Sequence, residues 1–306
     1  MEIRELTDGL QFPEGPVALP DGSVLVCEIR RGTLTRVLPD GACKIVAETG
    51  GGPNGAAVGA DGKVYVCNSG GDEWTERAGM MVPSGPGSAY RGGSIQRVDI
   101  ETGEVETLYT ECDGIPLKGP NDIVIDAEGG LWITDYGKTY ERHRDVTGVL
   151  YASPDGSSIR EVIFPLEGPN GIGLSPDGTR LYVAESIPGR LWAWEITGPG
   201  EIAQVPGLLQ GAGTLVAGVP GMQFFDSLGV DAEGGICVAT IRNTGDGGIT
   251  SISPDGATIE FFPMPDPIPT NICWGGPEQR TAYVTLSASG RLVACDWPRP
   301  GLKLNF

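Results

Sequence analysis

The sequence predicts an all-β fold, a six-bladed β-propeller with four antiparallel strands in each blade. The first observation behind this prediction is a cassette made of a short polar residue, an apolar strand and a glycine-containing turn. The second is its recurrence at a period of roughly 40 to 50 residues, which is typical of propeller blades. The third is the lack of any long stretch with helical periodicity. The cassettes lie at residues 13–22, 52–62, 119–129, 168–178, 225–234 and 269–276.

Within each repeat, the apolar strand leads through the turn into a second strand rich in β-branched and aromatic residues. Two such strands joined by a short Asp-Gly or Glu-Gly turn form a hairpin. The second strands are predicted at 24–27, 64–67, 131–134, 181–184, 236–239 and 282–285. Cys27 and Cys67 fall in these strands, and we expect them to be buried packing residues.

A third strand follows a glycine in every repeat, and several repeats show a fourth. The third strands begin after Gly32, Gly93, Gly148, Gly189, Gly248 and Gly290, and fourth strands are predicted at 44–47, 159–164 and 259–262. The last repeat stops after three strands near Trp297, whereas the chain begins with a spare strand at 2–7. Pairing these two ends would close the ring and remove an open sheet edge.

Composition narrows the classes of function. We expect residues 1–306 to form one domain, because a propeller grows by adding blades rather than by enlarging one core. The formal net charge of −19 argues against nucleic acid or an anionic membrane as partner. No apolar run is long enough to span a bilayer, no signal peptide is recognisable, and the seven cysteines show no disulfide or metal spacing. These features predict a soluble, cytoplasmic protein.

The polar residue that opens each cassette is the clue to function. In a propeller the innermost strands line the central channel, so equivalent residues at their starts form a ring. We call them the ring residues: Glu14, Asn54, Asn121, Asn170, Asp226 and Asn271. Any one of them could simply bond to the local backbone of a turn. As a set, oxygen donors that include two carboxylates favour Ca²⁺ or a similar divalent cation.

A cation on the axis of a wide channel would be too far from all six ring residues, so we expect an off-axis site. Neighbouring blades would supply Glu14, Asn170, Asp226 and Asn271. Water and substrate would complete the shell, as at a catalytic metal with an open position.

Long connections are expected on the same face as the ring and would form a lid over the site. These connections lie at 69–92, 112–119, 136–148 and 205–222. Their large side chains could supply an apolar wall, namely Trp74, Met80, Met81, Tyr90 and Tyr140. His143, the only histidine, falls in the third connection and is more typical of a solvated loop residue than of a catalytic base.

Four motifs together resemble the SMP-30/gluconolactonase/LRE-like family of six-bladed propellers over nearly the full length. They are FPEGP (12–16), KGPNDIVID (118–126), GPNGIGLSPDG (168–178) with LYVAES (181–186), and DSLGVDAEGG (226–235). The resemblance implies one divalent metal, most often Ca²⁺, with Zn²⁺, Mn²⁺, Mg²⁺ or Fe²⁺ as alternatives. It places the metal ligands at Glu14, Asn170 and Asp226.

The resemblance also implies a substrate-binding role for Asn121. We add Asn54 and Asn271, which complete the ring, and Lys118, which lies one step before the position where sugar-lactone members often carry an arginine. Glu141 is a candidate for the acidic lid residue that contacts sugar hydroxyls.

The expected activity is metal-dependent hydrolysis of a small-molecule lactone, with Asp226 acting as general base. Two alternatives stay open at this point. One is a non-enzymatic binding propeller in which the ion only stiffens the channel. The other is a related enzyme of different chemistry, either phosphotriester hydrolysis or a strictosidine-synthase-like condensation.

Overall fold

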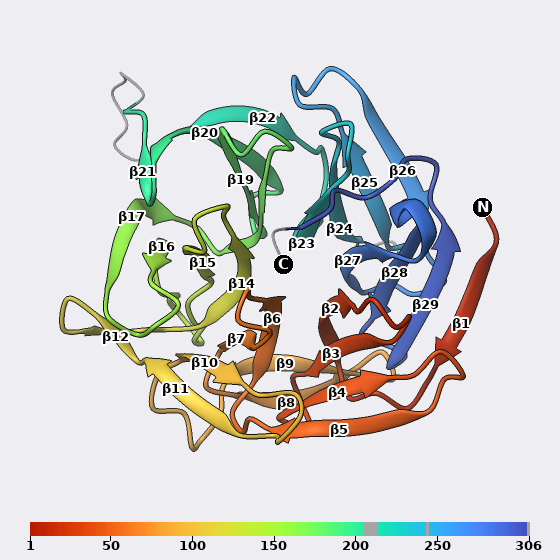
Figure 1. Ribbon diagram of the computed structural model, residues 1–306, viewed down its shortest axis with the longest axis horizontal. Helices are drawn as coiled ribbons and strands as arrows, with labels where there is room; N and C mark the ends of the chain where they lie inside the picture. Colours follow the sequence, from red (N-terminus) through yellow and green to blue (C-terminus); the bar gives the residue numbers. More distant parts are fainter. Residues whose placement is uncertain (205–212, 243–244, 305–306) are drawn as a thin grey trace.

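Six antiparallel sheets surround a central axis in the computed structural model (Figure 1), which describes residues 1–204, 213–242 and 245–304. The prediction of a six-bladed propeller is confirmed. The inner strands are β2 (Pro13–Ala18), β6 (Pro53–Val58), β14 (Pro120–Ile125), β18 (Pro169–Leu174), β23 (Gln223–Val230) and β27 (Pro269–Gly275). The second strands are β3 (Val24–Glu28), β7 (Val64–Asn68), β15 (Leu131–Asp135), β19 (Arg180–Glu185), β24 (Ile236–Arg242) and β28 (Thr281–Leu286).

The two outer positions of each blade complete the sheets. The third strands are β4 (Thr33–Val37), β10 (Ser94–Val98), β16 (Thr147–Ala152), β20 (Arg190–Gly198), β25 (Gly248–Ile252) and β29 (Arg291–Asp296). The outermost strands are β5 (Cys43–Glu48), β11 (Val105–Tyr109), β17 (Ile159–Leu166), β22 (Thr214–Gly218), β26 (Ile259–Pro263) and β1 (Ile3–Thr7). A short β21 (Glu201–Ile202) also pairs with β20, and a single 3₁₀ turn is described at Pro277–Gln279.

The ring closes as the sequence predicts. Strand β1 pairs antiparallel with β29, so the first strand of the chain completes the blade built by its last three strands. Figure 1 shows β1 beside β29 at the outer edge of this blade. This pairing covers the edge that β29 would otherwise leave open.

The expected lid connection at 205–222 needs a correction. Residues 214–218 form β22, which pairs with β20 as the outer strand of the fourth blade. The segment supplies the strand that this blade needs to bury β20, so this part of it is not a lid. Residues 205–212 of the same connection lie outside the described residues.

The second strands are buried on both faces because neighbouring blades pack against each of their sides. Strands β3, β7 and β15 consist entirely of buried residues, which fits their β-branched and aromatic sequences. Cys27 and Cys67 are fully buried, which confirms the prediction that they are packing residues, and all seven cysteines are free thiols. In the described ranges no helix has the length and apolarity needed to cross a bilayer.

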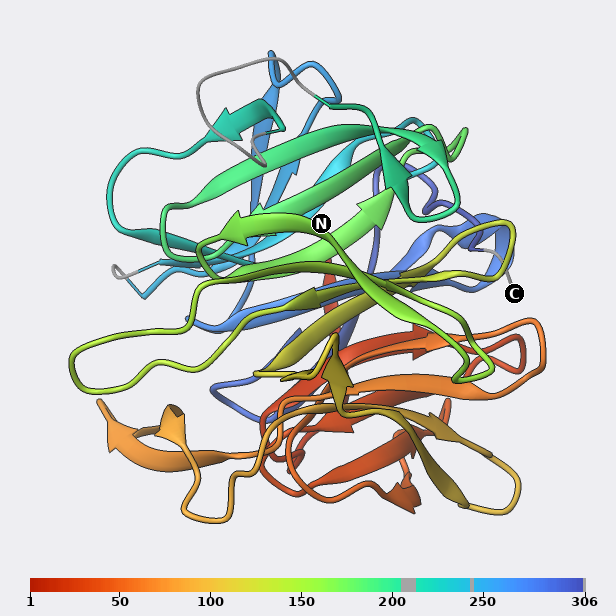
Figure 2. The same cartoon turned by 90° about the vertical axis from the view of Figure 1, so that its left-hand side faces the viewer.

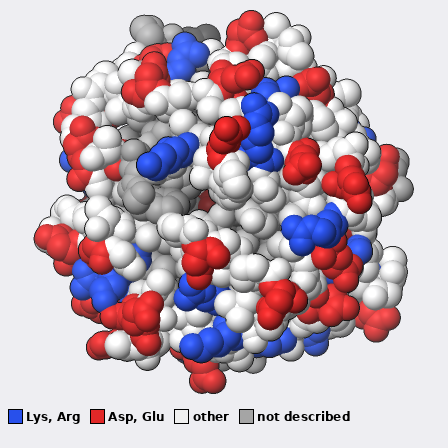
Figure 3. Space-filling view, turned by 45° about the vertical axis from the view of Figure 1, so that its right-hand side comes forward, with Lys and Arg blue, Asp and Glu red and all other residues white. Residues whose placement is uncertain are grey.

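The two faces of the propeller differ. In Figure 2 the hairpin of β8 (Asp72–Arg77) and β9 (Met80–Pro86) and the connection 136–148 project on one side, while the C-terminal segment lies on the opposite side. A small pair, β12 (Glu111–Cys112) and β13 (Ile115–Pro116), precedes the third blade. Figure 3 shows acidic side chains around the rim of the molecule, interspersed with lysine and arginine.

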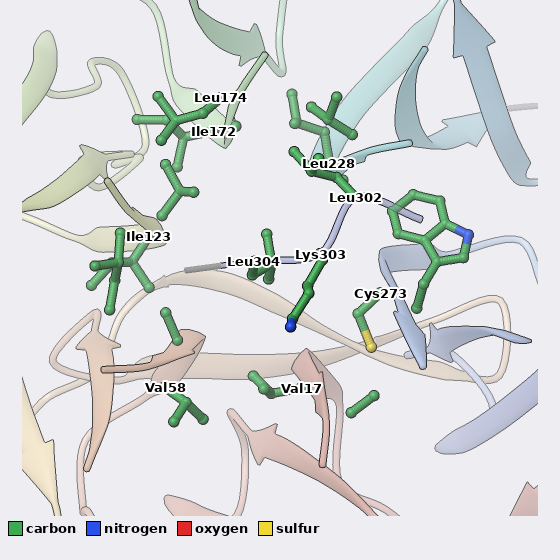
Figure 4. Close-up of a pocket in the computed structure, with 18 of the residues that line it drawn as sticks. Val17, Val58, Ile123, Ile172, Leu174, Leu228, Cys273, Leu302, Lys303 and Leu304 are labelled. Carbon is green, nitrogen blue, oxygen red and sulfur yellow. The ribbon is translucent and has the colours of Figure 1, made fainter. Parts of the chain in front are cut away.

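A cavity of about 1130 Å³ occupies the channel on the side away from the long connections. Its walls are apolar side chains of the inner strands, including Val17, Ile172 and Leu228, and the C-terminal residues 302–304 reach into it (Figure 4). The turns that follow the inner strands form its mouth, and Asp122 and Asn271 line its inner end. The ring therefore separates this apolar channel from the face that carries the lid.

Candidate functional site

The inner strands place the ring residues by a shared irregularity. In all six blades, the pairing of the inner strand with the second strand shifts register at or beside the ring residue. A β-bulge bends the strand and redirects the side chain at that position. The cassette is therefore the sequence signature of a bulge that interrupts strand pairing at each ring residue.

Glycine after the ring residue lets neighbouring inner strands approach closely. A Cβ atom on Gly15 would lie 2.2 Å from the carbonyl oxygen of Asn54, and one on Gly55 would lie 2.6 Å from that of Asn121. Gly171 faces the backbone of the fifth blade in the same way, with Leu228 N 2.5 Å from its hypothetical Cβ. These contacts explain the Glu-Gly and Asn-Gly dipeptides of the cassettes, because a larger residue would push the inner strands apart.

Two pairs of ring residues are joined by hydrogen bonds between adjacent blades. The side-chain amide of Asn170 donates to Asp226 Oδ1 at 2.6 Å, and that of Asn271 donates to Glu14 Oε2 at 2.9 Å. Ser186 accepts a second hydrogen bond from Asn170, while Ser227 donates to its Oδ1 atom. Each carboxylate of the ring is thus oriented by an asparagine of the preceding blade.

The remaining two ring residues have no such partner. Asn54 and Asn121 are 9% and 7% exposed, and the Oδ1 atom of each is buried without a hydrogen-bond partner in the described part of the chain. A buried oxygen without a donor is costly, and such exceptions call for a specific explanation. These two oxygens are open acceptors for a cation, a water molecule or a substrate hydroxyl.

The site holds more negative charge than its surroundings neutralise. Burial raises the pKa of the Glu14 carboxyl well above its usual value, and repulsion from Asp226 and Asp122 adds to the rise. Burial also raises the pKa of Asp226 to about 7; the hydrogen bond from Asn170 opposes this rise, and repulsion from Asp122 increases it. Both carboxyls therefore favour an opposite charge that no described side chain supplies.

Asp122 is the functional candidate that sequence reasoning missed. It follows Asn121 at the position where three blades carry glycine, and burial raises its pKa to about 7. The Ile123 amide donates to its carboxylate at 2.9 Å. The sequence signal is the Asn-Asp dipeptide of the third cassette. In three other blades the second position of this dipeptide is a glycine, which close packing of the inner strands requires.

The donor set fits a hard divalent cation. Carboxylate and amide oxygens are the ligands that Ca²⁺ prefers, and a double positive charge would offset the repulsion among the three carboxyls. Residues 1–204, 213–242 and 245–304 contain no cluster of three or more His, Cys, Asp and Glu side chains with metal-binding geometry. A cation would consequently depend on the asparagine oxygens as well as on Glu14 and Asp226.

Comparison with known proteins agrees with this architecture. The family model described as the SMP-30/gluconolactonase/LRE-like region matches residues 12–288. The chain belongs to the SMP-30/gluconolactonase/LRE-like family.

Proteins similar to this chain include enzymes. A gluconolactonase of Zymomonas mobilis is 26% identical, over 93% of this chain and 79% of its own length. The diisopropyl-fluorophosphatase of the squid Loligo vulgaris is 28% identical over 65% of this chain and 63% of its own length. A crystal structure of a protein assigned as a gluconolactonase superposes with a TM-score of 0.73 and 26% identity, covering 99% of this chain and 94% of the other.

Two long connections of this SMP-30/gluconolactonase/LRE-like protein join two blades through a buried ion pair. Lys138, in the connection after β15, contacts Asp72 Oδ1 of the β8–β9 hairpin at 2.7 Å, with side-chain exposures of only 5% and 15%. Its ammonium also donates to Ser69 and lies 5.3 Å from the centre of the Tyr90 ring. The hairpin is further held by Trp74, whose ring packs edge-on against Phe12 at 5.1 Å.

Three predicted lid or substrate residues lie in different settings. His143 is exposed and stacks on Tyr140 with 4.4 Å between ring centres, which fits a solvated loop residue. Glu141 is 89% exposed beside Arg142 and contacts no ring residue in the described structure. Lys118 is half-buried, and its backbone amide donates to Asp135 at 2.8 Å, so it is anchored next to the third inner strand.

Tyr136 and Arg144 are additional residues near the ring. Their side chains pack together against Gly168, two residues before Asn170. Burial raises the pKa of the Tyr136 phenol; Arg144 opposes this rise and the Asp226 carboxylate adds to it. Tyr136 is thus within electrostatic range of both the lid guanidinium and a ring carboxylate.

Proposed function

We propose that this protein hydrolyses a lactone with the help of one divalent cation, most often Ca²⁺, held by Glu14, Asn170 and Asp226. The observation that carries this proposal is the ring itself. Two buried carboxylates with raised pKa values, each oriented by an asparagine, share one rim with two unpartnered amide oxygens. The gluconolactonase of Zymomonas mobilis supports the choice of a lactone, because its alignment covers most of both chains.

A bound divalent cation would supply a Lewis acid that polarises a lactone carbonyl. The contribution of the chain begins with ligand orientation. Asn170 holds Asp226 through Oδ1, and Asn271 holds Glu14 through Oε2. Because these hydrogen bonds exist before substrate arrives, little reorganisation is needed at the moment of reaction.

Asp226 is the proposed general base. Its Oδ1 atom accepts the hydrogen bond from Asn170, which leaves Oδ2 to take a proton from the attacking water. The water oxygen forms a bond to the carbonyl carbon, the ring C–O bond breaks, and the proton passes to the departing alkoxide. A base is most effective when its pKa lies near the working pH. Burial raises the pKa of Asp226 to about 7 in the cation-free protein, and a neighbouring cation would lower it again.

Asn121 and Asn54 are the proposed substrate contacts, with Lys118 and Asn271 beside them. Their buried Oδ1 atoms accept hydrogen bonds, so hydroxyl groups on the lactone are suitable partners. A site built to bond a hydroxyl discriminates strongly against an analogue that lacks it. Asn121→Ala should therefore raise KM for hydroxylated lactones more than for unsubstituted ones.

The test is hydrolysis of sugar, aliphatic and aromatic lactones after chelation, with Ca²⁺, Mg²⁺, Mn²⁺, Zn²⁺ or Fe²⁺ added back. We expect activity to disappear on chelation and to return with at least one cation. Asp226→Asn should lower kcat by about a thousandfold or more, as expected for loss of a base and a ligand together. Unchanged activity in chelated Asp226→Asn protein would overturn the mechanism.

Hydrolysis at phosphorus is a second candidate, favoured by the relation to the squid diisopropyl-fluorophosphatase. Diisopropyl fluorophosphate should be tested together with the lactones, because we expect a fluorophosphate and a lactone to bind at the same ring residues. Absence of turnover on every compound, with cation-dependent stability retained, would instead indicate a binding propeller. The cytoplasmic location and the single-domain organisation stay predictions.

A further inference from the structure

Arg144 is a cation of the connection 136–148 that has no anionic partner among the described residues. The structure describes no ion pair for its guanidinium, and its Nε atom is buried without a hydrogen-bond partner. Its described interactions are all with Tyr136: a hydrogen bond from Nη2 to the carbonyl oxygen at 3.2 Å, a side-chain hydrogen bond with the phenol, and a position 5.0 Å from the centre of the ring. A partly buried guanidinium without a carboxylate is costly, because its charge loses hydration and gains little in return.

Neighbouring lid cations are paired. Lys138 contacts Asp72 at 2.7 Å, and Arg142 lies 3.8 Å from Glu141. The chain thus pairs the two cations that precede Arg144 in the connection 136–148 but leaves Arg144 itself without a carboxylate in the described structure. The difference is local and is not a consequence of a shortage of acidic residues, because Asp and Glu outnumber Lys and Arg by 40 to 21.

Arg144 also lies beside the reaction centre. Its Nη2 atom would be 2.6 Å from a Cβ on Gly168, and Tyr136 Cε2 would be 3.2 Å from the same point. Gly168 leads directly into Pro169 and Asn170, which donates to Asp226. The guanidinium and the proposed metal ligands are therefore parts of one side of the site.

We infer that Arg144 recognises an anionic substituent of the substrate, so that the preferred lactone carries a carboxylate, sulfonate or phosphate group away from its reacting carbonyl. The inference rests on the proposed lactonase function and specifies its substrate class. A planar guanidinium matches the oxygens of these groups, and stacking on Tyr136 fixes its plane in advance. Arg144 is a specificity residue in this scheme, while Asp226 performs the proton transfer.

The experiment compares matched lactones, namely gluconolactone and its counterparts with a carboxylate or a sulfonate at C6. The wild type should prefer the charged members in kcat/KM by about tenfold or more, which is the usual effect of a charge-assisted hydrogen bond. Arg144→Met should remove this preference mainly through KM and change the neutral lactone by less than about threefold. Arg144→Lys should retain part of the preference for charged lactones.

Arg142→Met is the matched control, because Arg142 belongs to the same connection and its side chain is 89% exposed. Arg142→Met should leave the ratio of kcat/KM between charged and neutral lactones unchanged. Isothermal titration with gluconate, glucarate and the C6-sulfonated acid gives a readout independent of turnover, and Arg144→Met should weaken only the doubly charged ligands. An equal loss on charged and neutral compounds, or no charge preference in the wild type, would overturn the inference.

The two proposals fail in different ways. Absence of hydrolysis across the panel rejects the lactonase function, whereas the binding titration still decides the role of Arg144. Thermal unfolding of each variant within a few degrees of the wild type ensures that a lost preference reports recognition and not misfolding.

Discussion

Asp226→Asn should stabilise the cation-free protein at pH 8, even though it removes a proposed catalytic residue. The Asp226 carboxyl is buried beside Glu14 and Asp122, and its pKa rises from 3.8 to about 7. Its ionised form is therefore disfavoured in the native state relative to the unfolded chain. Asparagine fills the same space and keeps an oxygen for the Asn170 amide, but carries no charge.

The size of the effect follows from the pKa. Each tenfold change in the acid constant is worth about 1.4 kcal/mol, so a rise from 3.8 to about 7 corresponds to about 4 kcal/mol. The contribution of Asp226 to the free energy of unfolding is fully present below the unfolded-state pKa and is lost as the pH rises through about 7. The advantage of Asp226→Asn should accordingly be small near pH 4 and approach about 4 kcal/mol at pH 8.

Ca²⁺ should stabilise the wild-type protein much more than Asp226→Asn. A ligand at a hundredfold excess over its Kd adds about 2.7 kcal/mol to the stability of a protein that binds it only when folded. Wild-type protein should gain this amount at pH 8, while Asp226→Asn, which has lost a proposed ligand, should gain much less. The difference between the two proteins should shrink by about 3 kcal/mol when Ca²⁺ replaces the chelator.

Urea unfolding followed by tryptophan fluorescence measures the free energy of unfolding of wild type and Asp226→Asn. The measurements are made at pH 4 and pH 8, each with EDTA or with Ca²⁺. Asp255→Asn is the control: the Ser253 hydroxyl lowers the pKa of this exposed carboxyl, so its removal should give no stability gain at pH 8. Equal stabilisation of wild type and Asp226→Asn by Ca²⁺ would show that Asp226 is not a ligand. A variant no more stable than wild type in EDTA would refute the argument from burial.

Two further predictions concern the lid and the inner strands. Lys138→Met leaves the Asp72 carboxylate without its partner. It should lower the free energy of unfolding in urea by about 3 kcal/mol and speed proteolysis of the β8–β9 hairpin. Lys63→Met breaks the ion pair with Asp99, whose side chains are more exposed at 39% and 24%, and should cost under about 1 kcal/mol; equal costs would contradict the reasoning. Gly55→Ala should cost about 2 kcal/mol or more, because its Cβ would lie 2.6 Å from Asn121 O. Gly218→Ala should cost less, because its Cβ would lie 3.9 Å from Gly189 O and its φ is not positive; thermal unfolding that ranks the two variants in reverse would refute the packing argument.

Repetition explains why so much of the fold could be predicted. The same strand and turn pattern occurs in every blade, so weak local signals reinforce one another, and the pairing of β1 with β29 followed from counting strands. The β22 strand was mistaken for lid because its blade carries a long insertion before the outer strand. The β8–β9 hairpin was seen only as a long connection, since nothing in its length specifies a hairpin.

Asp122, Tyr136 and Arg144 were not predictable in the same way. Their importance depends on what surrounds them: a carboxylate beneath the ring, a phenol between two charges, and a guanidinium whose neighbours are paired. Asp122 lies where inner strands of different blades meet, and the packing of Arg144 on Tyr136 depends on how the connection 136–148 folds, so neither is a property of local sequence.

The sequence by itself determined the ring, because a repeat with one residue in a fixed place must present that residue at the same height in every blade. Only the tertiary structure decided how the ring divides into two hydrogen-bonded pairs and two open amides. Asn271 meets Glu14 across 257 residues of sequence, and this contact exists only once the ring has closed. Closure thus decides which ring carboxylates are held by an asparagine of the neighbouring blade and which amide oxygens have no partner in the described structure.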